Sequence, residues 1–264
     1  MTSPKYPDPA SVVEPNYFSN WGDLWYPRLA NKLLRPASGV RFLTPNHLTI
    51  TSFLLYSLAS VLIVVGGKWI VPAAMLLVFS YVIDCLDGQL ARYTEQSSVI
   101  GDYLDKTLDV LKIGFINAAM AIAAYNLTGD IYYFLLGFSS CFGFLFRYYI
   151  KLEIIFGAIN RDKDYLDKSR TRRHALYAEL EIRRLMPKTF KQHLHWLWIR
   201  HHSVFALDEA EHVTFGAIAA LTCRPDLWCW LFGVGQICIA IFRLVGRGRQ
   251  LVQQPETLTD PLRK

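Results

Sequence analysis

The feature that most constrains this chain is a series of long apolar stretches. A helix needs about 20 mainly apolar residues to cross the hydrocarbon core of a bilayer. Six stretches approach that length, at residues 47–66, 69–90, 103–125, 131–150, 205–223 and 227–245. The pattern predicts an all-α, polytopic membrane protein with six transmembrane helices, although acidic residues crowd the start of the fifth stretch.

The basic residues indicate how such a bundle is oriented. An even number of spans places both termini on one side of the membrane. Of the 28 Lys and Arg residues, only Lys68 and Arg224 fall in connections on the opposite side. Because cytoplasmic loops carry an excess of Lys and Arg, we expect both termini to lie in the cytoplasm. This topology explains the net charge of +6, so nucleic-acid binding is not needed to account for it.

The spans divide the chain into three parts. Residues 1–45 form a cytoplasmic N-terminal segment, 46–245 a six-helix membrane domain, and 246–264 a cytoplasmic tail. Residues 17–45 mix aromatic, leucine and basic side chains, as expected of an amphipathic helix in the headgroup region. The basic connection at 151–204 is interpreted as helical segments that rest on the membrane surface. It closes with His193, His195, His201 and His202, whose spacing does not match a metal site.

Carboxylates gather where the second predicted span ends and the third begins. They form two stripes at helical intervals, Asp84, Asp87, Gly88 and Ala91 on the one and Gly101, Asp105 and Asp109 on the other. Two helices joined by a short turn can therefore face each other with four carboxylates between them. Charged residues within spans are rare and usually functional, and neighbouring carboxylates need cations to neutralise them. Since hard divalent ions prefer oxygen ligands, the pattern predicts a Mg²⁺ site, or a Mn²⁺ site, that can also receive a substrate phosphate.

A structural explanation of the same residues is also open. The aspartates could pair with Arg92, Lys106 or Lys112, or could line an ion pathway without any reaction. Close helix packing would account for the small residues taken alone. An ion pathway does not require glycine or alanine beside the carboxylates, so the combination favours a metal site.

The carboxylate pattern resembles the signature of the CDP-alcohol phosphotransferases. That signature reads D-x-x-D-G-x-x-A-R, eight residues, then G-x-x-x-D-x-x-x-D. All its fixed positions are present, as Asp84, Asp87, Gly88, Ala91, Arg92, Gly101, Asp105 and Asp109. The opening Thr44-Pro45-Asn46 of the first span is also similar to that family, so the resemblance covers about residues 40–150.

The resemblance implies a reaction and a role for each matched residue. It implies transfer of a substituted phosphoryl group from a CDP-linked donor to an alcohol acceptor, with release of CMP, in phospholipid synthesis. Asp84, Asp87 and Asp105 would hold two metal ions, while Asp109 would bind metal and accept the proton of the attacking hydroxyl. The contacts to the CDP part of the donor would come from Asn46, Thr49, Gly88, Arg92 and Ser98. Similar enzymes act on membrane lipid from the cytoplasmic side and often form homodimers.

The identity of the substrates stays open in the sequence. CDP-diacylglycerol is the favoured donor, and the alternative is a choline or ethanolamine phosphotransferase that combines a soluble CDP-alcohol with a lipid alcohol. A phosphorylated acceptor would need extra cations, for which the candidates are Arg147, Lys151 and Arg200. An amine-bearing acceptor would need carboxylates or aromatic rings, for which the candidates are Asp208, Glu209, Glu211, Tyr148 and Tyr149. The three acids could equally cap a helix N-terminus.

Two other classes of protein are less favoured. Membrane prenyltransferases also bind diphosphates through aspartates, but their motifs normally lie in distant repeats. Here both carboxylate pairs lie between Asp84 and Asp109. A non-catalytic membrane protein with this fold should keep its function after Asp109 is lost.

Overall fold

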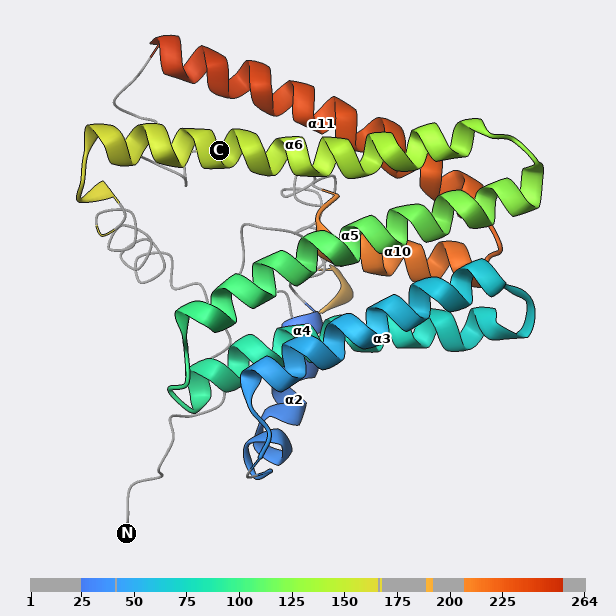
Figure 1. Ribbon diagram of the computed structural model, residues 1–264, viewed down its shortest axis with the longest axis horizontal. Coiled ribbons are helices and arrows are strands. Elements are labelled where there is room, and N and C mark those ends of the chain that lie inside the picture. Colours follow the sequence, from blue (N-terminus) through green and yellow to red (C-terminus); the bar gives the residue numbers. More distant parts are fainter. Residues whose placement is uncertain (1–24, 41, 166, 168–188, 192–206, 254–264) are drawn as a thin grey trace.

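The computed structural model describes residues 25–40, 42–165, 167, 189–191 and 207–253 (Figure 1). The helices in this part are α2 (Tyr26–Ser38), α3 (Pro45–Val65), α4 (Ile70–Tyr93), α5 (Val99–Thr128), α6 (Tyr132–Arg161), α10 (Glu209–Leu221) and α11 (Pro225–Gln253), with a short 3-10 helix η2 (Gly67–Trp69) between α3 and α4. The described residues contain no strand. The prediction of an all-α fold is therefore confirmed for the part of the chain that the structure describes.

Local sequence signals explain where the central helices begin and end. Thr44 precedes α3, and its hydroxyl accepts a hydrogen bond of 3.3 Å from the backbone N–H of His47. Ser98 precedes α5, and its hydroxyl accepts a bond of 3.0 Å from the N–H of Gly101. These side chains satisfy N–H groups that lack a partner at a helix start. Helix α5 ends at Thr128, and the following Gly129 has a φ of 80°, a left-handed conformation that favours glycine.

The helices pack in two connected groups. Helix α3 contacts both α4 and α5, and α2 and α10 pack against α4 (Figure 1). Helix α6 packs along α11 and also contacts α5. The α6–α11 approach is close because small residues lie in it: a Cβ atom at Gly143 would lie only 2.8 Å from the backbone of Gln236. Small residues at such contacts are typical of helix packing in membranes.

Four helical segments have the length and composition to cross a membrane. They are Pro45–Val65, Gly67–Tyr93, Val99–Thr128 and Pro225–Arg249, which contain the first, second, third and sixth predicted spans or most of them. Many of their large apolar side chains are exposed, such as Leu54 at 60% and Met75 at 68%. Such exposure is expected where lipid covers the surface. The chain is therefore treated as an integral membrane protein.

The other two predicted spans are not established by this structure. Helix α6 contains the fourth and has 30 residues, but its Tyr, Ser and Arg side chains lower its mean hydropathy. Helix α10 covers part of the fifth and has 13 residues, fewer than a perpendicular crossing needs. The count of six spans and the orientation of the termini stay predictions.

Helix α2 lies within the predicted interfacial segment. Its residues Tyr26, Ala30 and Leu34 are buried, and the Tyr26 hydroxyl forms a hydrogen bond of 2.8 Å with Thr214 in α10. Burial raises the pKa of Tyr26, so the phenol stays protonated and able to donate. The apolar face of α2 thus packs on the protein, and its position in the headgroup region stays a prediction. Most of the connection at 151–204, including its four C-terminal histidines, lies outside the described residues.

Candidate functional site

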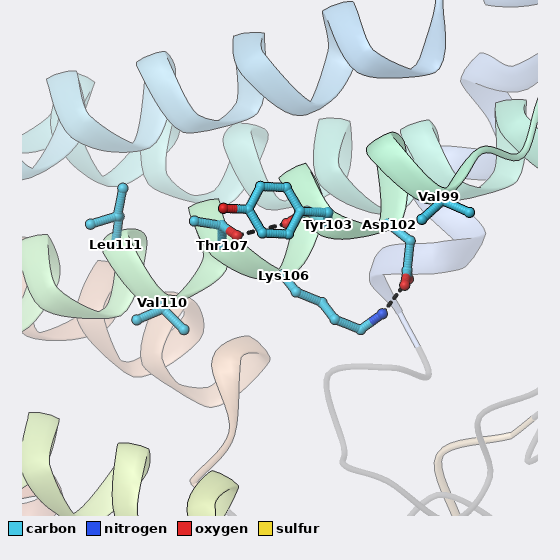
Figure 2. A pocket seen from close by; sticks show the side chains of 7 residues that line it. All are labelled: Val99, Asp102, Tyr103, Lys106, Thr107, Val110 and Leu111. Carbon is cyan, nitrogen blue, oxygen red and sulfur yellow. Dashed lines mark hydrogen bonds and ion pairs between the residues drawn. The ribbon is translucent and has the colours of Figure 1, made fainter. Parts of the chain in front are cut away.

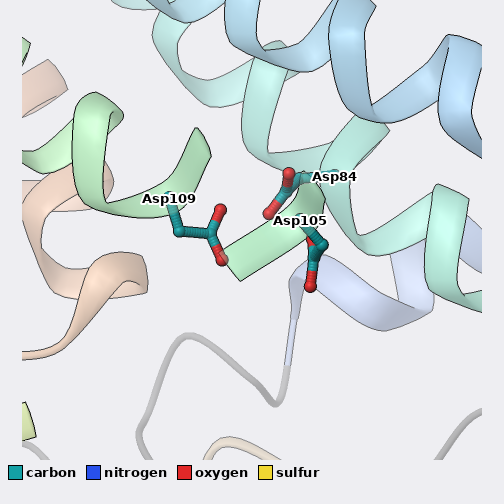
Figure 3. Close-up of side chains that lie close together, drawn as sticks. All are labelled: Asp84, Asp105 and Asp109. Atoms are coloured by element: carbon teal, nitrogen blue, oxygen red, sulfur yellow. The ribbon is translucent and has the colours of Figure 1, made fainter. Parts of the chain in front are cut away.

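Helices α4 and α5 bring three of the predicted ligands together. Asp84 lies in the last turns of α4, while Asp105 and Asp109 lie in the first turns of α5. One carboxylate oxygen from each lies within 4.8 Å of those of the other two (Figure 3). The two helices run in opposite directions around a short turn, so their stripes face each other as expected from the spacing. This group of three carboxylates is hereafter called the aspartate cluster.

Asp87 has a different environment from the cluster. It lies one helical turn after Asp84 and is only 6% exposed. The hydroxyl of Thr49 on α3 donates a hydrogen bond of 2.6 Å to its Oδ2 atom. Asp87 is therefore anchored to α3, and its role as a fourth metal ligand stays a prediction.

A lysine of α5 is bonded to the aspartate cluster. The ammonium of Lys112 donates hydrogen bonds to Asp84 and, at 2.9 Å, to Oδ1 of Asp109. The hydroxyl of Ser52 donates another bond of 3.0 Å to Asp84. The ion-pair explanation thus holds for Lys112, which is buried. It does not hold for Lys106, whose ammonium pairs with the exposed Asp102 instead. A buried ammonium here shows that the carboxylates need positive charge beside them.

The predicted donor contacts lie at the same end of the three central helices. A Cβ atom at Gly101 would lie 3.0 Å from Oδ1 of Asn46 and 3.1 Å from the hydroxyl of Ser98, so the missing side chain lets α3 and α5 meet. A Cβ atom at Gly88 would lie 3.4 Å from Nη1 of Arg92, so the guanidinium lies over the glycine. Of the predicted donor contacts, Thr49 is hydrogen-bonded to Asp87. Their contact with a nucleotide stays a prediction.

Behind the aspartate cluster lies a small cavity of about 10 Å³, close to the least space that holds one water molecule. Its lining residues are Tyr56, Tyr81, Asp84, Asp109, Lys112, Ile113, Glu209 and Val213. The sequence suggested Glu209 either for an amine-bearing acceptor or for a helix cap, and it did not suggest Tyr56. A signal for Tyr56 was present, because Thr49, Ser52 and Tyr56 share one face of α3 at helical spacing.

A second, larger hollow lies on α5 itself. It has a volume of about 540 Å³, and Figure 2 shows the side chains that line it, Val99, Asp102, Tyr103, Lys106, Thr107, Val110 and Leu111. None of the three clustered aspartates lines it. Its largely apolar lining fits lipid contact, so the candidate chemistry is assigned to the aspartates and not to this hollow.

Three of the residues considered for acceptor recognition, Arg147, Asp208 and Glu211, have structural contacts. Arg147 is 1% exposed, pairs with Asp208, and donates a bond of 2.9 Å to Gln236. The carboxylate of Glu211 accepts a bond of 3.0 Å from the backbone N–H of Asp208, which is a helix-capping contact. Arg147 thus joins α6 to α10 and α11, while Arg200 lies outside the described residues.

Comparisons with known proteins agree with this geometry. Residues 42–169 match the family model described as CDP-alcohol phosphatidyltransferase. An archaetidylinositol phosphate synthase from Pyrococcus horikoshii is 41% identical over 69 residues, which are 26% of this chain and 36% of that protein. A bifunctional IPC transferase and DIPP synthase from Thermococcus kodakarensis is 34% identical over 95 residues, which are 36% of this chain and 21% of that protein.

The matched segment contains the residues that define the site. It includes the aspartate cluster, Asp87, Lys112 and every predicted donor contact. The resemblance expected from the aspartate signature is thereby confirmed, although the alignments span well under half of either relative. Residues 42–169 therefore form a domain of the CDP-alcohol phosphatidyltransferase family.

Proposed function

We propose that this chain is a membrane enzyme of phospholipid synthesis. It transfers a phosphatidyl or other substituted phosphoryl group from a CDP-linked donor to the hydroxyl of an alcohol, and CMP leaves. The observation that carries the proposal is the aspartate cluster, in which three carboxylates from two helices lie within 4.8 Å of one another. It lies inside the segment that matches the family model.

The donor atoms of the cluster fit a hard divalent cation. Carboxylate oxygens are the ligands that Mg²⁺ and Mn²⁺ prefer, and such ions commonly keep coordination positions for substrate phosphates. Asp84, Asp105 and Asp109 would hold the metal, with Asp87 completing a site for two ions. When bound, the ions draw charge from the diphosphate and stabilise CMP as the leaving group.

Asp109 is proposed as the general base. Its carboxylate belongs to the aspartate cluster, within 4.8 Å of a carboxylate oxygen of Asp84 and of Asp105. A carboxylate in this position can accept the proton of the acceptor hydroxyl as the hydroxyl attacks phosphorus. Such general-base catalysis typically contributes about 10²–10⁴-fold to the rate.

The residues around the cluster are proposed to bind the CDP part of the donor. Arg92 presents a planar guanidinium over Gly88, and its fork suits phosphate oxygens. Asn46 and Ser98 offer polar atoms beside the start of α5, where glycine keeps the backbone accessible. Thr49 orients Asp87 and stands next to the same space.

CDP-diacylglycerol is proposed as the donor, and a soluble CDP-alcohol with a lipid acceptor is the second candidate. One relative is named an archaetidylinositol phosphate synthase, a name that favours a lipid-linked donor. The exposed apolar faces of the helices would let a lipid tail remain in the bilayer during the reaction. We also propose that the site and both termini face the cytoplasm, and that two copies pair in the membrane.

The deciding experiment measures CMP release by the purified full chain. CDP-diacylglycerol, CDP-choline and CDP-ethanolamine are each offered with Mg²⁺ or Mn²⁺ and a panel of free and phosphorylated alcohols. Release with one donor and one alcohol, abolished by EDTA, supports the proposal and identifies both substrates. No release from any pair, by protein shown to be folded and metal-loaded, would contradict it.

A further inference from the structure

Lys112 occupies a position that metal binding would disturb. Its ammonium bonds Asp84 and Asp109, two of the three carboxylates that can hold a metal ion. A divalent cation on these ligands would meet a buried positive charge at hydrogen-bond distance from them. Like charges repel strongly where the surroundings are poorly polarisable. Metal binding therefore calls for another anionic partner for Lys112.

Glu209, at the start of α10, is a carboxylate within reach of that ammonium. Lys112 and Glu209 both line the small cavity. The neighbouring acids are engaged elsewhere, because Asp208 pairs with Arg147 and Glu211 accepts a bond from the helix start. The side chain of Glu209 makes no hydrogen bond or ion pair with the residues that the structure describes.

The hydroxyl of Tyr56 gives a second, independent observation. Tyr56 is only 2% exposed, lines the same cavity, and has no hydrogen-bond partner for its hydroxyl among the described residues. Buried polar groups are nearly always hydrogen-bonded, so an unsatisfied one indicates that a polar group enters the space beside it. A tyrosine hydroxyl can accept a bond from an ammonium.

We propose that Lys112 moves from Asp84 and Asp109 to Glu209 when a divalent cation binds the aspartates, and that Tyr56 accepts a second hydrogen bond from it there. The inference rests on the proposed function, since it requires metal at the cluster. Lys112 and Glu209 are thus positioning residues that touch neither substrate. The metal ion and the Lys112 ammonium compete for the same carboxylates. The affinity for metal therefore depends on how strongly the Glu209 carboxylate binds the ammonium.

The first test measures Mn²⁺ affinity of the full chain in detergent by isothermal titration calorimetry. Glu209→Gln keeps the side-chain volume but removes the acceptor for Lys112. We expect it to weaken Mn²⁺ binding by about 10–100-fold, as is typical for groups that support metal ligands. The matched control is Glu153→Gln, an exposed glutamate on α6, which should leave the affinity unchanged.

The second test separates relocation from simple attraction between Glu209 and the metal. Lys112→Met removes the competing ammonium and should tighten Mn²⁺ binding by at least about fivefold, the lower end of typical coupling. In a chain that already carries Lys112→Met, Glu209→Gln should weaken Mn²⁺ binding much less than it does in the wild-type chain. An equal loss in both backgrounds, or weaker binding by Lys112→Met alone, would overturn the proposal. Lys106→Met, on the outer face of α5, is the control.

A third variant covers the case in which Lys112→Met does not fold. Tyr56→Phe removes only a hydroxyl and no charge, so through-space attraction cannot account for an effect on metal affinity. We expect about a 2- to 10-fold weaker affinity for Mn²⁺, the range of one lost hydrogen bond. Unchanged affinity in both Tyr56→Phe and Glu209→Gln would refute the inference alone. A wild-type chain that binds no Mn²⁺ would refute the proposed function as well.

Discussion

The hydroxyl of Thr49 lies 2.6 Å from Oδ2 of Asp87 and donates a hydrogen bond to it, which joins α3 to the helix that carries the first half of the aspartate signature. Both residues are almost fully buried, at 3% and 6% exposed. The bond therefore couples a predicted donor contact to a predicted metal ligand. It also fixes how α3 and α4 meet at the functional end of the bundle.

Loss of this bond should affect both stability and activity. Thr49→Val leaves a buried carboxylate without its partner, which costs about 1–3 kcal/mol. We expect a lower melting temperature in detergent and a higher KM for the CDP-linked donor. Thr49→Ser keeps the hydroxyl and should restore most of both properties. Equal behaviour of the Val and Ser variants would show that the hydrogen bond is unimportant.

Asp109→Asn should abolish transfer while the fold remains. The amide keeps the size of the side chain but cannot accept the proton of the acceptor, so CMP release should fall by at least about 10²–10⁴-fold. The matched control is Asp102→Asn, an exposed aspartate on the same helix that pairs only with Lys106 among the described residues. It should retain nearly full activity, and both variants should keep the wild-type circular dichroism spectrum. Normal turnover by Asp109→Asn would exclude the proposed general base.

The sequence predicted the aspartate cluster because the signal is local. Asp84 lies on the stripe of one helix and Asp105 and Asp109 on that of the next, with a short turn between them, so helical spacing and the hairpin suffice to bring them together. The same reasoning separates Lys112 from Lys106. Lys112 continues the stripe three residues after Asp109, whereas Lys106 is rotated away from it.

The spacing of residues within one segment does not predict contacts between segments that are distant in the sequence. The cavity behind the cluster needs Glu209, which comes about a hundred residues after Asp109 and reaches it only through the packing of α10 on α4 and α5. Arg147 was considered for substrate binding, yet it is paired with Asp208 and Gln236 from two later helices. The acidic residues at the start of α10 also made the start of the fifth predicted span uncertain. A hydropathy pattern does not distinguish buried acids from exposed acids that lie outside a span.

Arg92→Lys should weaken donor binding more than it slows the chemical step. Lysine keeps the charge but loses the planar fork that can bond two phosphate oxygens at once. We expect a KM for the CDP-linked donor that is raised by about tenfold, with a smaller change in kcat. Steady-state CMP release across donor concentrations measures the two constants. A fall in kcat with an unchanged KM would instead assign Arg92 to the transition state.

The close approach of α3 and α5 makes Gly101 sensitive to a single methyl group. In Gly101→Ala the added Cβ would lie 3.0 Å from the Asn46 side chain and 3.1 Å from the Ser98 hydroxyl, so both predicted donor contacts must shift. We expect weaker donor binding and a lower melting temperature. The control is Gly114→Ala on the same helix, where nothing lies within 4 Å of the new Cβ.

The two glycine variants have the same chemistry but opposite expected effects. Alanine is favoured over glycine within a helix by about 1 kcal/mol, so Gly114→Ala should be neutral or slightly stabilising and fully active. Gly101→Ala gains the same helix propensity, and any loss it shows must come from the contact with Asn46 and Ser98. Thermal melting and donor KM, measured on both variants side by side, therefore test whether the end of α3 and the start of α5 form one binding surface. Equal, unaltered KM values would remove Asn46 and Ser98 from the proposed nucleotide site.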